Sequence, residues 1–220
     1  MNIDPVRIAD NYRALRARVD RLGGPDVGIV AVTKTFPIEA VRAVHDAGCP
    51  TVGENYAQEL VAKFSGVAPT ERPEIHFIGQ LQSNKVRSLA PFVSTWQTVD
   101  RASLVDELAR RVPAARILVQ VDLTGEPGKG GCAVSDLDDL TARAIDRGLL
   151  VAGLMVVGPT GGDPDDTRRC FRTAASLVTA RGLTELSMGM SGDWEMAVDE
   201  GSTLIRVGSA IFGDRPPIGA

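Results

Sequence analysis

The feature of this sequence that most constrains its fold is a regular alternation of short apolar runs with amphipathic helical patterns. We expect eight strands, at residues 27–34, 51–53, 75–79, 92–99, 115–123, 149–157, 184–188 and 204–208. A helical pattern separates each strand from the next, as in parallel sheets with helical crossovers. Eight such units in 220 residues predict an α/β fold, a (β/α)8 TIM barrel, with a single domain over residues 1–220.

The two ends of the sequence bear on how the outer ring of helices closes. No helical pattern follows the eighth strand, whereas residues 5–22 form an amphipathic pattern that starts at Asp4-Pro5. We therefore expect this N-terminal helix to complete the outer ring. The competing architecture, an open doubly wound sheet, requires a glycine-rich turn after the first strand, and Thr33-Lys34-Thr35-Phe36 is not one.

Composition and charge exclude several classes of function. The net charge is -4 and no basic run occurs, so we expect no nucleic-acid partner. No apolar stretch approaches the roughly 20 residues of a membrane span, and Met1-Asn2-Ile3-Asp4-Pro5 lacks the features of a signal peptide. Cys49, Cys132 and Cys170 are odd in number and widely spaced, which favours buried thiols in a reducing cytoplasm.

Lys34 closes the first buried strand, where the ligand site of such a fold lies. Partial burial lowers the pKa of a lysine and makes its neutral, nucleophilic amine more available. The alternative is a surface lysine that starts a loop.

A second set of residues follows strands seven and eight, where barrels often hold a phosphate. Ser191-Gly192 stands at the start of a predicted helix, and Gly208-Ser209 lets the backbone approach a ligand closely. Taken singly, these residues also suit ordinary turns and a helix cap. Taken together after these two strands, they favour a phosphate site.

A lysine facing a phosphate site suggests a phosphorylated aldehyde, and pyridoxal 5′-phosphate (PLP) is the obvious candidate. Arg206, on the eighth strand, can meet the pyridine nitrogen. Because arginine keeps its proton, it would donate a hydrogen bond and leave that nitrogen unprotonated. The alternative for Arg206 is a partner for a core carboxylate.

Several segments of the chain, in order from about residue 5 to Arg215, resemble the pyridoxal phosphate homeostasis protein family, the single-domain relatives of the alanine racemase barrel. These segments are Ala31-Val32-Thr33-Lys34, Gly53-Glu54-Asn55-Tyr56 with Gln58-Glu59, His76-Phe77-Ile78-Gly79 with Leu81-Gln82-Ser83-Asn84-Lys85, Gly153-Leu154-Met155, Leu186-Ser187-Met188-Gly189-Met190-Ser191-Gly192-Asp193, Arg206-Val207-Gly208 and Ile211-Phe212-Gly213.

The resemblance implies a fold-type III PLP-binding barrel with PLP bound to Lys34 as a Schiff base. It further implies that Ser191 and the amides near Gly192, Gly208 and Ser209 bind the phosphate. Arg206 would lie at the pyridine nitrogen, with Asn55 and Met155 close to the ring.

Two parts of the resemblance leave questions open. His76 matches a family position, and it is equally suited to be a core histidine with satisfied hydrogen bonds. The segment Asp122-Leu123-Thr124-Gly125-Glu126-Pro127-Gly128-Lys129 departs from the Asn-x-Ser-Gly-Glu-Glu-Ser-Lys pattern common in the family, which puts a ligand role for this loop in doubt.

The resemblance implies a protein that buffers PLP and passes it to apo-enzymes, and we expect it to be a cytoplasmic monomer. The alternative is a racemase-like PLP enzyme of fold type III. The sequence ends at Ala220, without the carboxyl-terminal domain that supplies an opposite-face tyrosine in the related racemases, and Tyr12 and Tyr56 are not evident substitutes. A metal-dependent hydrolase is disfavoured because His45 and His76 do not make a metal site.

Overall fold

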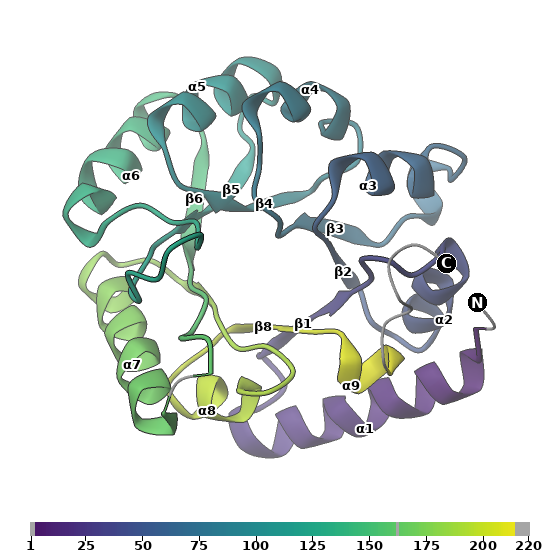
Figure 1. Cartoon of the computed structure of the whole chain (residues 1–220). Helices are drawn as coiled ribbons and strands as arrows, with labels where there is room; N and C mark the ends of the chain where they lie inside the picture. The colour runs from purple at the N-terminus through teal and green to yellow at the C-terminus, as the bar shows by residue number, and fades with distance from the viewer. Residues whose placement is uncertain (1–2, 162, 214–220) are drawn as a thin grey trace.

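The computed structural model describes residues 3–161 and 163–213, and its eight strands form a closed barrel (Figure 1). The strands follow one another around the barrel in chain order, every neighbouring pair is parallel, and β1 pairs with β8 to close it. This confirms the predicted (β/α)8 architecture. The strands are β1 (Gly28–Val32), β2 (Thr51–Glu54), β3 (Glu74–Phe77), β4 (Thr95–Val99), β5 (Arg116–Gln120), β6 (Leu150–Met155), β7 (Glu185–Ser187) and β8 (Leu204–Val207).

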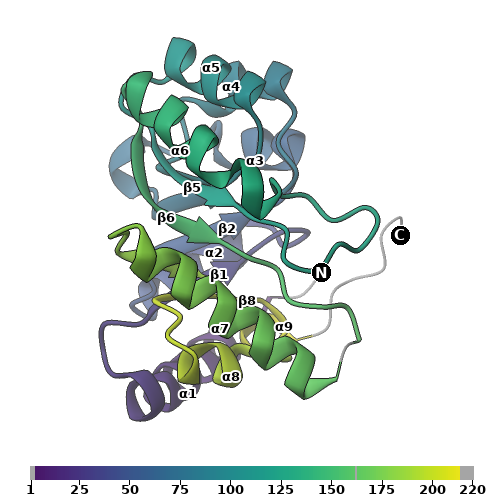
Figure 2. The same ribbon diagram turned by 90° about the vertical axis from the view of Figure 1, so that its left-hand side faces the viewer.

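Helices surround the barrel, and the apolar core lies between them and the strands (Figures 1 and 2). The α-helices are α1 (Pro5–Gly23), α2 (Ile38–Asp46), α3 (Ala57–Phe64), α4 (Val86–Leu89), α5 (Ala102–Arg111), α6 (Leu137–Asp146), α7 (Pro164–Ala180), α8 (Trp194–Asp199) and α9 (Ser209–Phe212). Short 3-10 turns lie at η1 (Pro69–Glu71), η2 (Ser83–Lys85) and η3 (Val134–Asp136).

The N-terminal helix α1 completes the outer ring, as predicted. Asp4 caps it by accepting a hydrogen bond from the Arg7 amide at 3.1 Å, and Pro5 occupies the first turn, where no amide hydrogen is needed. Its apolar face is buried, and it contacts α2 on one side and α8 and α9 on the other. Figure 1 shows α1 running along the edge of the barrel between these elements.

The prediction that no helix follows the eighth strand is wrong, because α9 follows β8 directly. Its four residues are too few to show a helical period. Tertiary contacts hold it instead. The Phe212 ring lies 5.0 Å from the Phe36 ring, and the Asn11 side chain donates a hydrogen bond to the Ile211 carbonyl at 2.9 Å.

Two helix starts also differ from the sequence prediction. The sequence predicts a helix over residues 54–64, but the helix begins at Ala57, because Glu54 belongs to β2. Ser135 is the cap that the sequence predicts for a helix over residues 135–147. It lies instead in η3, and its hydroxyl donates to the Asp136 carboxylate at 3.1 Å, while α6 starts at Leu137.

The three cysteines are free and buried, as the sequence suggested. Among the described residues, no group of histidine, cysteine and carboxylate side chains is arranged to hold a metal ion.

None of the helices in residues 3–161 and 163–213 combines the length and the apolar character needed to cross a membrane.

Candidate functional site

Lys34 lies at the mouth of the barrel, on the turn between β1 and α2. The strand ends at Val32, two residues earlier than the sequence suggested, although the Thr33 amide still donates to the Gly53 carbonyl of β2 at 3.0 Å. Lys34 is half-buried there. The next residue, Thr35, has a φ of 68°, a left-handed conformation that is uncommon for a β-branched residue. The turn at Lys34 therefore contains a backbone conformation that ordinary loops rarely place at a β-branched residue.

A buried charge cluster adjoins this turn, and the sequence analysis assigned it no role. The Lys63 ammonium donates to Glu54 Oε1 at 2.6 Å and to Glu59 Oε1 at 2.9 Å. Thr33 Oγ1 also donates to Glu54 Oε1, at 2.7 Å. Burial raises the pKa of Glu54, and the nearby Lys63 and Thr33 oppose that rise. The i, i+4 spacing of Glu59 and Lys63 could have predicted their ion pair, but not its attachment to the Lys34 turn.

Two of the predicted phosphate-binding residues, Ser191 and Gly208, meet on the β7–β8 side of the mouth, next to β1. The Gly208 amide donates to Ser191 Oγ at 3.3 Å, which brings the loops after β7 and β8 together. Gly192 is exposed, and a Cβ placed on it would meet nothing within 4 Å. The helix predicted over residues 193–200 starts at Trp194, with Asp193 at its N-cap, so Ser191 and Gly192 lie in the turn just before it. Ser209 is exposed at the start of α9.

The two sides of the mouth are adjacent because β1 and β8 pair with each other. Val30 is in register with Arg206, and Ala31 with Val207. A Cβ added to Gly208 would lie 3.4 Å from the Val32 carbonyl oxygen and 3.5 Å from Val32 Cβ. The turn that carries Gly208 therefore lies against the end of β1, two residues before Lys34. Barrel closure, which no local sequence pattern reveals, creates this juxtaposition.

Arg206 is buried inside the barrel, with neutral partners. One guanidinium nitrogen donates to Ser187 Oγ at 2.8 Å and the other to the Val156 carbonyl at 3.0 Å. These partners argue against the alternative of a core carboxylate. Burial lowers the pKa of Arg206 to about 10, against an opposing effect of Asp193, so the side chain remains charged at neutral pH. A buried cation thus lies on the strand beside β1.

A chain of hydrogen bonds links Arg206 to His76 across the interior of the barrel. Ser187 Oγ donates to Gln97 Oε1 at 2.7 Å, and Gln97 Nε2 lies 2.7 Å from His76 Nδ1. Because Arg206 can only donate, the direction of each bond follows from that end, and His76 Nδ1 must accept. Burial, with a smaller effect of Arg116, lowers the pKa of His76 to about 4. His76 is therefore a neutral core histidine with a satisfied ring nitrogen.

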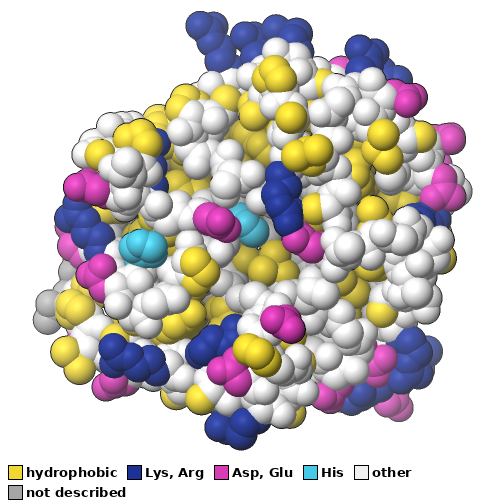
Figure 3. All heavy atoms as spheres, turned by 180° about the vertical axis from the view of Figure 1, so that it is seen from behind, with side chains coloured by type: hydrophobic (Ala, Val, Ile, Leu, Met, Phe, Trp, Pro, Cys, Tyr) yellow, Lys and Arg dark blue, Asp and Glu magenta, His cyan; other side chains and the backbone are white. Residues whose placement is uncertain are grey.

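His76 faces the amino-terminal end of the barrel, opposite Lys34. It lines a cavity of about 540 Å³ together with Glu74, Arg116 and Glu185. Figure 3 views the molecule from behind Figure 1 and shows acidic, basic and histidine side chains gathered near the centre of this face. Arg116 and Glu185 form an ion pair here. The hydrogen-bond chain from Arg206 therefore ends at the amino-terminal face of the barrel, away from the mouth.

Asn55 and Met155, both predicted near the ring, lie at the carboxyl ends of their strands. Asn55 follows β2, and its buried Oδ1 accepts no hydrogen bond from any described part of the chain. Met155 ends β6, is 2% exposed, and is in register with Ser187 and Gln120. The structure places both at the mouth, Asn55 just after β2 and Met155 at the end of β6.

The loop that departs from the family pattern is held by hydrogen bonds within its own turn and by contacts with the segment after β6. Asp122 Oδ1 accepts hydrogen bonds from the Thr124 and Gly125 amides at 2.9 and 3.1 Å. The Lys129 ammonium pairs with Glu126 at 3.0 Å and donates to the Gly158 carbonyl at 2.6 Å. The Asp122 carboxylate is therefore used within its own turn.

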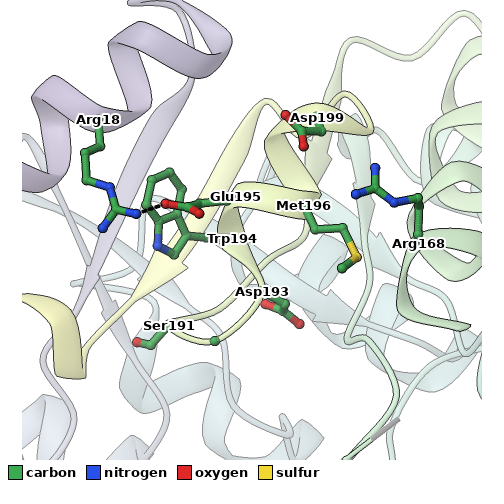
Figure 4. A pocket seen from close by; sticks show the side chains of 9 residues that line it. Arg18, Arg168, Ser191, Asp193, Trp194, Glu195, Met196 and Asp199 are labelled. Atoms are coloured by element: carbon green, nitrogen blue, oxygen red, sulfur yellow. Dashed lines mark hydrogen bonds and ion pairs between the residues drawn. The ribbon is translucent and has the colours of Figure 1, made fainter. Parts of the chain in front are cut away.

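A separate cavity of about 450 Å³ lies beside Ser191, towards the outer helices. Figure 4 shows Ser191 and Asp193 on the loop before α8, with Trp194, Met196 and the Arg18–Glu195 ion pair beyond them. Its lining comes from α1, α7, α8 and the loop before α8, so it flanks the mouth and shares Ser191 and Gly192 with it.

Comparisons with known proteins agree with this geometry. The sequence profile of the alanine racemase N-terminal domain matches residues 3–216. The pyridoxal phosphate homeostasis protein of Pseudomonas aeruginosa is 37% identical over 222 residues, covering 94% of this chain and 96% of the relative. Its counterpart in Escherichia coli is 33% identical over 225 residues, covering 95% and 94%.

Solved structures give the same result. PipY of Synechococcus elongatus PCC7942, determined with PLP bound, is 33% identical, with a TM-score of 0.84 over 94% of this chain and 100% of PipY. Alanine racemase from Corynebacterium glutamicum, at 18% identity and a TM-score of 0.72, shares the fold over 99% of this chain and 63% of that enzyme. Identity over nearly the whole length, in a barrel that carries the matched motifs at its mouth, shows that the chain belongs to the pyridoxal phosphate homeostasis protein family.

Proposed function

We propose that this protein binds PLP at the barrel mouth as a Schiff base on Lys34 and serves the homeostasis of PLP by buffering and carrying it. The observation that carries the proposal is the adjacency of the Ser191–Gly208 turn to the end of β1, which brings a candidate anion site beside the Lys34 turn. The names of the relatives and the PLP in PipY support the same ligand.

The residues at the mouth fit PLP on chemical grounds. Backbone amides and a serine hydroxyl suit a phosphate, and space is open above Gly192. Asn55 Oδ1 is buried and has no partner among the described residues, so it offers a polar contact to a bound molecule. PLP supplies a reactive aldehyde that a lysine amine can capture covalently.

Each residue receives a distinct role in this proposal. Lys34 provides the amine. Ser191 and the amides near Gly192, Gly208 and Ser209 hold the phosphate. Asn55 and Met155 line the ring.

Arg206 has the chemistry to hold the pyridine nitrogen without protonating it. A guanidinium has five N–H donors, and the two donors described above use only part of this capacity. Because arginine donates and does not release its proton, the ring nitrogen stays unprotonated and the cofactor is a weak electron sink. This favours carriage of PLP over turnover of amino acids.

A racemase-like enzyme is the second candidate, since the barrel has the fold of alanine racemase. The positions of the tyrosines weigh against it. The Tyr12 hydroxyl donates to the Gly48 carbonyl at 3.4 Å in the outer ring, and Tyr56 is 50% exposed beside α3. Neither is a natural second base at Lys34.

We propose a cytoplasmic monomer that delivers PLP to apo-enzymes.

Titration of the purified protein with PLP, followed by borohydride reduction and gel filtration, tests this function. We expect one equivalent of a chromophore that survives reduction and travels with the protein. Lys34→Ala should lose the fixed chromophore and keep weaker, dialysable binding through the phosphate residues. Wild-type protein that retains no PLP at any concentration near stoichiometry would contradict the proposal.

A further inference from the structure

The charge cluster beside Lys34 is closed around a single buried ammonium group. The Lys63 side chain is 5% exposed, and its Nζ donates to Glu54 Oε1 at 2.6 Å, Glu59 Oε1 at 2.9 Å and the Thr33 carbonyl at 2.8 Å. An ammonium group has three hydrogens, and all three are used. The position of Lys63 Nζ is therefore fixed by one backbone and two carboxylate contacts.

The contacts of this cluster end on the two peptide groups that flank Lys34. The Thr33 carbonyl belongs to the peptide between Thr33 and Lys34, and it accepts from Lys63. The Thr35 amide belongs to the peptide between Lys34 and Thr35, and it donates to Glu59 Oε1 at 2.6 Å. One ion cluster thus holds the backbone on both sides of Lys34.

The conformation of Thr35 shows why the backbone around Lys34 needs these stabilising contacts. Its φ of 68° places a β-branched side chain in the left-handed region. Such a backbone persists only where its surroundings enforce it, and it is concentrated at functional sites. The hydrogen bond from the Thr35 amide to Glu59 is a direct enforcing contact.

We propose that Glu54, Glu59 and Lys63 form a positioning cluster that sets the backbone of Lys34 and so presents its amine to an incoming aldehyde. The three are positioning residues, because they act through the Thr33 and Thr35 peptides. The cluster also ties α3 to the β1–α2 turn. This inference deepens the proposed function and depends on it for the identity of the aldehyde.

The test compares substitutions of Glu59, which is the most exposed member of the cluster at 27%. Glu59→Ala removes the acceptor of the Thr35 amide, whereas Glu59→Gln keeps an oxygen that can accept. Glu107→Ala is the matched control, because Glu107 forms a similar i, i+4 pair with Arg111 on α5.

Two readouts separate positioning from mere stabilisation. The first is hydrogen exchange of the Thr35 amide by NMR in the ligand-free protein. The second is the rate at which stoichiometric PLP forms the borohydride-stable product. We expect Glu59→Ala to raise Thr35 exchange and slow PLP capture, each by roughly tenfold or more, with Glu59→Gln close to wild type. Glu107→Ala should change neither.

Unchanged Thr35 exchange in Glu59→Ala, or faster exchange with an unchanged rate of capture, would overturn the positioning cluster. Equal slowing of capture by Glu107→Ala would overturn it too, since the effect would then reflect general stability. A wild-type protein that fails to capture PLP contradicts the proposed function instead. Thr35 exchange in the absence of PLP still decides whether the cluster holds the turn.

Discussion

The two sides of the barrel mouth are held by different kinds of interaction. On the β1–β2 side, the charged side chains of Glu54, Glu59 and Lys63 grip the backbone around Lys34. On the β7–β8 side, the Gly208 amide meets the Ser191 hydroxyl in a turn where Gly192 is open to solvent. A residue that must form a covalent bond needs a defined backbone. A phosphate needs only amides and hydroxyls that converge on it.

This difference predicts unequal responses to substitution. Side chains on the Lys34 side are interdependent, since removing one leaves buried charges without partners. The phosphate side relies on backbone amides, which every substitution except one to proline leaves in place. A single side chain there therefore affects ligand binding more than folding. The predictions below run from the largest expected effect to the smallest.

Lys63→Met should have the largest effect on stability. It leaves Glu54 and Glu59 without their cation, and breaking a buried ion pair in this way costs about 3–5 kcal/mol. Urea unfolding of wild type and variant measures the difference. Lys63→Met combined with Glu54→Gln should recover part of the loss, because the remaining buried carboxylate is neutralised. If Lys63→Met leaves the free energy of unfolding nearly unchanged, the cluster does not stabilise the β1–β2 side of the mouth.

The neutral His76 at the end of the interior hydrogen-bond chain should make the free energy of unfolding depend on pH. The folded-state pKa of His76 is lowered to about 4 from an ordinary 6.5, so between these values the unfolded chain binds a proton that the folded chain does not. Stability is therefore complete above pH 6.5 and falls as the pH drops towards 4, by at most about 3 kcal/mol. His76→Gln, measured in parallel by urea unfolding, should remove this part of the pH dependence. Identical profiles for the two proteins would contradict it.

Ser191→Ala should weaken PLP retention without changing the melting temperature. The hydroxyl contributes one charge-assisted hydrogen bond, worth roughly 1.5–3 kcal/mol, which corresponds to a dissociation constant about ten- to a hundredfold higher. Equilibrium dialysis against PLP provides the measurement. Unchanged dissociation in this variant would remove Ser191 from the phosphate site.

The smallest expected signal is turnover of amino acids by the PLP-loaded protein. In the proposed binding mode Arg206 leaves the ring nitrogen unprotonated, and neither Tyr12 nor Tyr56 is placed to act as a second base. We therefore expect no racemisation, transamination or decarboxylation at ordinary rates. Chiral chromatography after long incubation with common amino acids checks this. A rate on the order of 1 s⁻¹ or above that disappears in Lys34→Ala would make the protein an enzyme.

Sequence reasoning reached the barrel because strand and helix periods repeat along the chain, and it named Lys34, Ser191 and Gly208 because their strand ends must share one face. It missed α9, which is too short to show a period and is held by Phe36 and Asn11. Sequence reasoning also did not predict the charge cluster or the hydrogen-bond chain from Arg206 to His76. Both join residues on different elements, such as Gln97 on β4 and Ser187 on β7, whose contact depends on barrel closure.

Peptide mapping after borohydride reduction tests the central claim most directly, namely that Lys34 is the residue to which PLP is bound. The PLP-loaded protein is reduced, digested and analysed by mass spectrometry, with Lys63 and Lys129 as internal comparisons at the same mouth. We predict a pyridoxyl label on Lys34 at close to one per chain and no label on the other two. Labelling that falls mainly on another lysine, or that persists in Lys34→Ala at the wild-type level, would contradict the account.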